Sequence, residues 1–160
     1  MTTEPFIVFA PDVPEQEGHY PPPFEKERLG LFRDLGKAAG SVSLGFAMDR
    51  LPAGERSSFT HAHEREEELV YVLEGECVVR LIEPGHAPRE VPLRAGHAVS
   101  FVAGTRLAHC FLNRGTRDCL LFTVGERKRD TERCFYAEDR DYDAFFARAS
   151  PEKYWAEGSG

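Results

Sequence analysis

Residues 59–76 read FTHAHEREEELVYVLEGE, and this stretch carries the strongest signals of fold and chemistry in the chain. Two histidines, His61 and His63, stand one residue apart. Side chains two residues apart in a β-strand lie on the same face, so both imidazoles are expected to point toward one interior site. Four acidic residues follow within five positions, and an apolar run then ends at glycine. The pattern predicts a strand that presents ligands, followed by a strand that forms part of the core.

Glu68 is the acidic residue of this stretch that the alternation places on the apolar face. It shares its parity with Val70 and Val72, so its carboxylate is expected to point inward at the mouth of an apolar strand. A buried carboxylate needs a compensating charge, and a cation would supply it. The other acidic residues of the stretch are interpreted as a solvated turn: Glu64, Glu66 and Glu67.

A third histidine, His109, lies on a later strand-like segment whose same face carries Phe111 and Asn113. If that strand lies beside the first, three imidazoles and one carboxylate converge, and this ligand set suits a divalent transition metal. The alternative interpretation is that each histidine is an ordinary core residue with a satisfied hydrogen bond. The remaining histidines lie in loops or at a strand start where nothing recruits them: His19, His86 and His97.

The wider pattern predicts an all-β domain. Residues 42–50 alternate with a period of two, and further short runs of the same kind are separated by Gly, Pro, Asn or charged turns. Short strands at even spacing are typical of an antiparallel sandwich or barrel. Tyr142, Phe145 and Phe146 have helical spacing and predict one helix. The other predicted strands are residues 68–73, 77–82, 98–102, 109–112 and 119–124, and the predicted helix covers 141–149.

The composition narrows the functional classes. A chain of 160 residues is expected to form one domain. A net charge of -7 without a basic cluster disfavours nucleic acid as a partner. No apolar run approaches the roughly 20 residues of a membrane span, and the first residues lack a basic region and a cleavage site, so we expect a cytoplasmic protein with no membrane partner. The four cysteines contain no C-x-x-C pair and are predicted to be reduced, mostly buried thiols.

Two segments together resemble the two sequence motifs of the cupin superfamily. Residues 54–75, GERSSFTHAHEREEELVYVLEG, look like the first motif, G-x5-H-x-H-x(3,4)-E-x6-G, with one extra residue before the first histidine. Residues 96–113, GHAVSFVAGTRLAHCFLN, resemble the second, G-x5-P-x-G-x2-H-x3-N. Val102 stands where proline is usual, and four residues instead of two separate Gly104 from His109. The chain is similar to small single-domain bacterial cupins.

The resemblance implies a jelly-roll barrel, the cupin double-stranded β-helix, over residues 28–136. Residues 1–27 are rich in proline and are predicted to form an extended arm on a surface. Residues 137–160 are predicted to form the C-terminal helix and a tail. Barrels of this kind commonly pair through sheet faces, so we expect a homodimer in which the arm lies against the partner or against the barrel's outer face.

The resemblance also implies one bound metal ion. Imidazole-rich ligation with one carboxylate fits Fe(II), Mn(II), Ni(II), Co(II) or Zn(II), and the sequence does not choose among them. Parity suggests an apolar pocket beside the metal that would take a small organic ligand. The implied ligands are His61, His63, Glu68 and His109. The pocket-lining candidates are Phe46, Met48, Phe59, Phe101 and Phe111.

Two classes of function remain open at this point. The first is a metal-dependent enzyme, of dioxygenase, isomerase or lyase type, that acts on a small oxygenated molecule. The second is a non-catalytic module that binds or senses such a molecule. No general acid or base beyond the ligands is identified, because Tyr71 has the opposite parity to Glu68 and is expected to pack away from the site.

Overall fold

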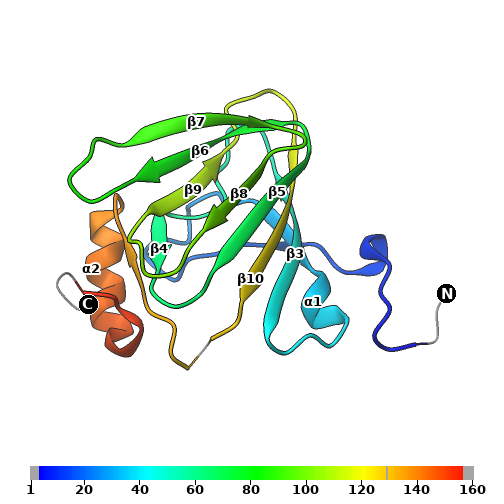
Figure 1. Ribbon diagram of the computed structural model, residues 1–160, viewed down its shortest axis with the longest axis horizontal. Helices are drawn as coiled ribbons and strands as arrows, with labels where there is room; N and C mark the ends of the chain where they lie inside the picture. Colours follow the sequence, from blue (N-terminus) through cyan, green and yellow to red (C-terminus); the bar gives the residue numbers. More distant parts are fainter. Residues whose placement is uncertain (1–3, 129, 157–160) are drawn as a thin grey trace.

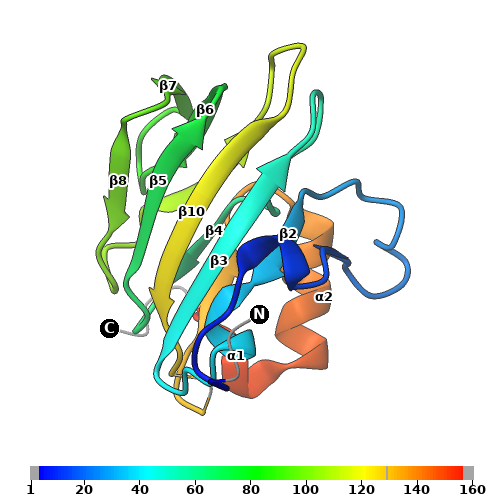
Figure 2. The ribbon, with the colours of Figure 1, turned by 90° about the vertical axis from the view of Figure 1, so that its right-hand side faces the viewer.

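The computed structural model describes residues 4–128 and 130–156, which form two antiparallel β-sheets packed face to face (Figure 1). The six-stranded sheet has the order β1-β2-β3-β10-β5-β8, and the five-stranded sheet has the order β11-β4-β9-β6-β7. Figure 2 shows β3, β10, β5 and β8 side by side in the first sheet. The predicted all-β class and jelly-roll barrel are confirmed.

The strands of the six-stranded sheet are β1 (Gln16–Glu17), β2 (Leu31–Asp34), β3 (Leu44–Leu51), β10 (Cys119–Glu126), β5 (Glu68–Glu74) and β8 (Ala98–Phe101). Those of the five-stranded sheet are β11 (Cys134–Tyr136), β4 (His61–His63), β9 (Ala108–Leu112), β6 (Glu76–Ile82) and β7 (Arg89–Arg94). The helices are α1 (Leu35–Ala38) and α2 (Arg140–Ala149), with short 3-10 turns at Ala10–Asp12 and Pro151–Lys153.

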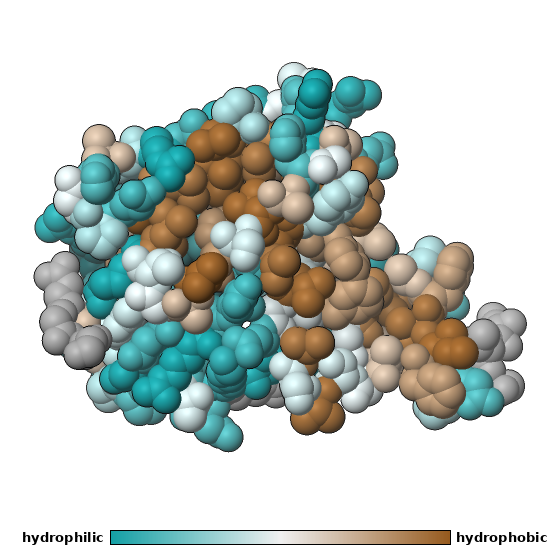
Figure 3. All heavy atoms as spheres, in the orientation of Figure 1, coloured by the Kyte–Doolittle hydropathy of each residue, from teal (hydrophilic) through white to brown (hydrophobic). Residues whose placement is uncertain are grey.

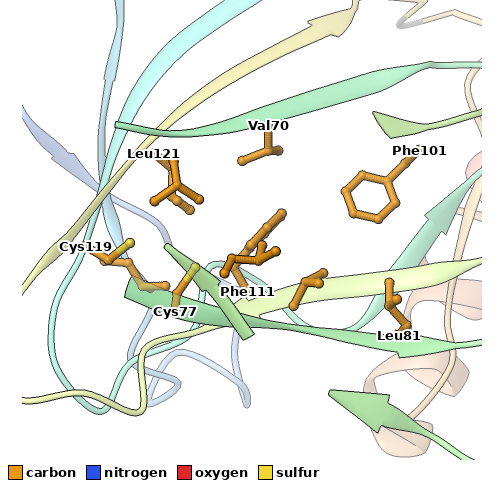
Figure 4. Packing of buried hydrophobic residues seen from close by; sticks show 11 residues of the cluster. Val70, Cys77, Leu81, Phe101, Phe111, Cys119 and Leu121 are labelled. Atoms are coloured by element: carbon orange, nitrogen blue, oxygen red, sulfur yellow. The ribbon is translucent and has the colours of Figure 1, made fainter. Parts of the chain in front are cut away.

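Alternation along β5 builds the core between the two sheets. Val70 and Val72 are buried, whereas Leu69 and Tyr71 are exposed, so the parity predicted for this strand is confirmed. Side chains from the opposite sheet, including Phe111, meet them in the interior (Figure 4). Burying each such side chain contributes about 1.5–3 kcal/mol. This packing holds the two sheets together.

The apolar face predicted for β3 is the outer face of its sheet. Arg50 lies outside, where its guanidinium donates to Asp118 at 3.0 Å, and Phe46 and Met48 share its parity. Phe46 packs against Phe122 of the neighbouring strand, with ring centroids 4.5 Å apart, and against Gly36 of α1. This face is apolar because side chains from β10 and α1 pack on it.

The inner face of β3 therefore carries small and polar residues. Leu51, which is buried in the core, shares its parity with Asp49, Ala47 and Gly45. On the inner face of β3, a large apolar side chain is found only at the Leu51 end of the strand. The other end has room for a polar site.

The proline-rich arm lies on its own barrel over part of its length. β1 adds to the edge of β2, with Gln16 paired to Phe32. Tyr20 stacks on Phe59 with ring centroids 4.1 Å apart, and its hydroxyl accepts a hydrogen bond of 2.8 Å from the Phe59 backbone N–H. Residues 4–9 extend away from the barrel (Figure 1), and Phe6 is exposed.

α2 confirms the predicted helix, but the residues that follow it do not form a free tail. Trp155 is buried against Ala62 of β4 and Ala108 of β9, and its backbone N–H donates to the Cys134 carbonyl at 2.9 Å. The Arg106 guanidinium lies 4.4 Å from the centre of a Trp155 ring. Residues 151–156 thus cover the outer face of the five-stranded sheet, and residues 157–160 lie outside the described part.

Among the described residues, four strands have no counterpart in the sequence prediction: β1, β2, β7 and β11. β7 is an edge strand that contains Pro92, a position where a missing N–H costs no ladder bond. The cysteines are free, and Cys77, Cys110 and Cys119 are buried, as predicted. Within the described residues, no helix has both the length and the apolar character needed to cross a membrane.

Candidate metal site

Three imidazoles converge between the two sheets at the polar end of the barrel. β4 and β9 are neighbours, and His61 pairs directly with His109 in the register. The Nε2 atoms of His61 and His63 are 3.0 Å apart. One ring nitrogen from each of the three histidines lies within 4.8 Å of the others. The strand that carries His109 therefore lies beside the strand that carries His61 and His63, as the convergence of the three imidazoles requires.

The ring nitrogens that face away from this point have partners on two of the three histidines. His61 Nδ1 lies 2.9 Å from the Phe59 carbonyl oxygen, which accepts a hydrogen bond from it. His63 Nδ1 lies 3.2 Å from a carboxylate oxygen of Glu132. A proton held at Nδ1 leaves the Nε2 lone pair free, and this is the tautomer that a metal ion needs.

Glu68 completes the cluster from the opposite sheet. Its carboxylate oxygen lies 3.1 Å from Nε2 of His109. The His109 ring is stacked on Phe101, with centroids 3.5 Å apart and planes at 6°. His109 Nδ1 is buried and has no hydrogen-bond partner among the described residues. His109 is therefore positioned by packing and by Glu68.

The electrostatics of the cluster suit a cation. Burial, together with neighbouring His63 and His109, lowers the pKa of His61 to about 3, so this imidazole is neutral at pH 7. Burial alone would raise the pKa of Glu68, but the bond to His109 and the nearby imidazoles outweigh it and lower that pKa to about 2. The charged carboxylate of Glu68 and the neutral imidazole of His61 are in the protonation states that bind a divalent metal. The residues present fit such an ion.

A cavity of about 230 Å³ opens beside the cluster. Gly45 and Ala47 of β3 and Gly125 of β10 form part of its lining and leave the space because they have little or no side chain. His63 and Glu68 reach into the same lining. Small molecules could therefore approach the imidazoles from the β3–β10 side.

Asp49 is the inward-facing acid that sequence analysis did not identify. Its carboxylate accepts a hydrogen bond from the Thr123 hydroxyl, and Thr123 lines the cavity. Burial raises the pKa of Asp49 to about 6, with a further contribution from the negative charge of Glu68. β10 lies between the strands that carry Asp49 and Glu68, so the two acids flank it on the interior of the barrel.

The predicted pocket residues have different positions. Phe101 covers His109, and Phe111 lies deeper in the core with its ring 6.4 Å from that of His109. Phe59 belongs to an aromatic cluster with Tyr20 and packs beneath α2. As the register of β3 shows, Phe46 and Met48 lie on the outward-facing side of that strand, although Phe46 also borders the cavity.

The acidic turn between β4 and β5 is more ordered than predicted. Glu64 forms a two-pronged ion pair with Arg133, at 2.5 and 2.6 Å. Glu66 accepts a hydrogen bond from the Lys128 backbone N–H. Glu67 is exposed, in agreement with the prediction. The partners of this turn come from the segment that follows β10, more than 60 residues later in the chain. A local sequence pattern therefore does not predict these contacts.

The family model for the cupin domain matches residues 47–125, a range that contains all four candidate ligands. This chain is a small cupin-domain protein. The strand order and the position of the imidazoles agree with the resemblance found in the two sequence motifs. No match was found among curated proteins.

Solved structures similar to this cupin include several enzymes. A sugar phosphate isomerase of the cupin superfamily from Silicibacter pomeroyi is 27% identical, with a TM-score of 0.73 and 82% of each chain covered. A predicted oxalate decarboxylase from Thermotoga maritima is 25% identical, with a TM-score of 0.57, over 75% of this chain and 97% of the other. The polyketide cyclase RemF from Streptomyces resistomycificus is 20% identical, with a TM-score of 0.63 over 92% and 94%, and shows the shared fold.

Two residues at the site, Asp49 and Glu132, escaped the sequence analysis. Asp49 had a usable signal, because it is the charged residue with the parity of the small residues in β3. The prediction took the more apolar face of β3 as the inner one, and Asp49 lies on the opposite face. Glu132 had no local signal, since its contact with His63 joins residues 69 positions apart.

Proposed function

We propose that this cupin binds one divalent transition metal through His61, His63, Glu68 and His109 and acts on a small oxygenated organic molecule. The observation that carries the proposal is the convergence of three imidazole nitrogens within 4.8 Å, beside a carboxylate and a cavity. When bound, Fe(II), Mn(II), Ni(II), Co(II) or Zn(II) would supply Lewis-acid polarisation of a substrate oxygen or activation of dioxygen.

Among the dioxygenase, isomerase and lyase types, an isomerase is favoured. Isomerisation needs a group that accepts a proton at one atom and returns it at another. Asp49 faces the interior beside the cavity, and a pKa near 6 suits both steps near neutral pH. The Thr123 hydroxyl donates to this carboxylate and fixes its orientation. The similarity to the isomerase from Silicibacter pomeroyi supports the same choice.

The charge of the cavity favours an uncharged substrate. Its lining carries the carboxylates of Asp34, Glu66, Glu67, Glu68 and Glu126. Arg127 also lines the cavity, but its guanidinium is paired with the Asp34 carboxylate at 2.7 and 2.9 Å. The positive charge of Arg127 is therefore neutralised by Asp34. An acidic lining repels a phosphate group. A neutral hydroxy-carbonyl compound, such as an unphosphorylated sugar, fits this lining better than its phosphate ester.

Metal-loaded protein and a paired substrate panel test the proposal. The panel contains aldoses and ketoses with and without phosphate, and NMR follows their interconversion while an oxygen electrode follows dioxygen uptake. Asp49→Asn should abolish turnover and leave metal content unchanged. Asp118→Asn, which alters an acid on the outer surface, should change neither. A neutral sugar that binds without turnover would instead support the non-catalytic module, and turnover unchanged in Asp49→Asn would refute the role of Asp49.

We also propose that the protein forms a homodimer through the outer face of the six-stranded sheet. Leu69, Tyr71 and Leu73 on β5 are each more than 40% exposed. The projecting N-terminal residues add Phe6 and Phe9, and Figure 3 shows apolar surface on the barrel and on this projection. Contiguous exposed apolar surface of this kind is typical of protein interfaces.

Sedimentation of the wild type and two variants tests the homodimer. Leu69→Lys places a charge in the middle of the apolar face and should produce a monomer. Val42→Lys alters another exposed apolar residue, in the turn between α1 and β3, and should leave the dimer intact. A wild type that sediments as a monomer would refute the proposal.

A further inference from the structure

Glu132 lies on the segment between β10 and β11 and contacts a candidate metal ligand. Its Oε1 lies 3.2 Å from Nδ1 of His63. The same carboxylate accepts backbone N–H bonds from Glu64 at 3.1 Å and Arg65 at 3.0 Å. These contacts fix the position of both oxygens. Glu132 lies outside residues 47–125, the range that the cupin-domain model matches.

The three imidazoles differ in what holds their outward nitrogen. His61 Nδ1 faces a backbone carbonyl at 2.9 Å, which no substitution of a side chain removes. His109 Nδ1 has no hydrogen-bond partner among the described residues. Among the three, His63 alone has a carboxylate at Nδ1. The tautomer of His63 is therefore set by one side chain, and that side chain can be changed.

We infer that Glu132 is a positioning residue that holds the proton of His63 at Nδ1 and so keeps the Nε2 lone pair directed at the candidate metal site. A carboxylate can only accept a hydrogen bond, so Nδ1 must be the donor in the neutral imidazole. An imidazole oriented in this way is a stronger and more rigid metal ligand. This inference rests on the proposed function, since it assigns a role toward the same metal.

Described residues on both sides of position 129 tie the segment that carries Glu132 to the acidic turn between β4 and β5. The Glu64 N–H donates to the Arg133 carbonyl at 2.9 Å, and Lys128 Nζ donates to the Arg65 carbonyl at 2.8 Å. The Glu126 carboxylate accepts the Glu67 backbone N–H at 3.1 Å. The segment therefore fixes the turn and brings Glu132 to His63. In Figure 1 the described residues on either side of position 129 lie at the lower end of the barrel and lead from β10 of one sheet to β11 of the other.

This arrangement supplies a matched control. Glu126 ends β10 and Glu132 lies on the segment that follows it, and both accept backbone N–H groups of the same turn. Only the contact of Glu132 extends to an imidazole. Glu126→Gln thus reports the loss of an anchor alone, whereas Glu132→Gln reports the loss of the anchor charge and of the His63 partner.

A competing arrangement uses the same residues. His63, Glu66 and Glu132 lie within 4.8 Å of one another and could bind a cation through Nδ1 of His63. The backbone N–H bonds to both oxygens of Glu132 compete with such a role. Glu66→Gln separates the two arrangements, because it would weaken a cation at this second cluster and leave the tautomer of His63 unchanged.

The first measurement is made on metal-free protein. Long-range 1H–15N correlation of the imidazoles at about pH 9, where neutral imidazole predominates, shows which nitrogen carries the proton. His63 should carry it at Nδ1 in the wild type and in Glu126→Gln. In Glu132→Gln a substantial fraction should move to Nε2, because the amide N–H₂ can donate to a bare Nδ1. An unchanged tautomer in Glu132→Gln would overturn the inference whether or not the protein binds metal.

The second measurement is metal affinity, by competition of Co(II) and Zn(II) against an indicator dye. Glu132→Gln should weaken binding by about 10–100-fold, and Glu126→Gln and Glu66→Gln should remain within about threefold of the wild type. In a His63→Ala background Glu132→Gln should have no further effect, because its partner is already gone. Equal losses in Glu132→Gln and in either control would overturn the inference. A wild type that binds neither ion refutes the proposed function instead, and the tautomer measurement still decides the role of Glu132.

Discussion

The Nε2 atoms of His61 and His63 face each other at 3.0 Å between the two sheets of the barrel. At this distance two neutral imidazoles can form one N–H···N hydrogen bond, provided that one of them carries its proton at Nε2. If both carry the proton at Nδ1, their Nε2 lone pairs face each other and can share a cation. The contacts of both Nδ1 atoms with oxygen acceptors favour the cation.

Removing either histidine should remove the metal and leave the fold. His61→Ala or His63→Ala should sharply lower metal occupancy, because each change deletes one of four ligands. The barrel should stay folded, because apolar packing between the sheets stabilises its core without help from the metal ion. Elemental analysis and circular dichroism measure the two effects. His86→Ala removes an exposed loop histidine and serves as the control. Wild-type protein that stays metal-free after incubation with all five candidate ions would contradict the site.

Glu68 and its neighbour Glu67 should differ strongly. Glu68→Gln keeps the shape of the side chain but removes the charge beside His109, so metal binding should weaken by about 10–100-fold or more. Glu67→Gln changes an exposed, screened carboxylate and should bind metal nearly as the wild type does. Competition against an indicator dye measures both. Damage from Glu67→Gln with Glu68→Gln silent would mean that the register of β5 is shifted by one residue.

Asp49 should destabilise the folded protein at high pH. Its pKa is raised to about 6 from an ordinary value near 3.8, so the folded state favours the protonated form. The resulting cost is absent below pH 3.8, develops as the pH rises toward 6, and is complete above 6. Asp49→Asn removes it, and the variant should therefore melt at a higher temperature than the wild type at pH 8 but not at pH 3.5. Thermal melts of metal-free protein test this, and a difference that grows toward low pH would contradict the assignment.

Tyr20 should be essential to the stability of the barrel although it belongs to the arm. Tyr20→Ala should cost about 3–5 kcal/mol, because it opens a cavity against Phe59 and Tyr142. Tyr20→Phe keeps the ring but leaves the Phe59 N–H without its acceptor, so about 1–3 kcal/mol should be lost. Urea unfolding measures both losses. Phe9→Ala, at an exposed position in the same arm, should change stability by less than about 0.5 kcal/mol. Equal stabilities for all three variants would show that the arm does not pack on the barrel.

Much of the fold and of the candidate ligand set follows from local sequence pattern. The alternation after Glu68 predicts its inward parity because a strand places every second side chain on one face, and burial of Val70 and Val72 confirms it. The same rule failed for β3. There the more apolar face lies outward, with Phe46 packed on Phe122, because α1 and the neighbouring strand also bury side chains on that side.

By itself, the sequence determined most of the central strands and placed His61 and His63 on one face, because these features depend on residues two positions apart. Only the tertiary structure decided that His61 lies beside His109, that Asp49 faces the interior, and that Glu132 reaches His63. These relationships join residues far apart in the chain. They depend on strand order, on what covers each face of a sheet, and on the path of the segment after β10, none of which leaves a periodic trace in the sequence.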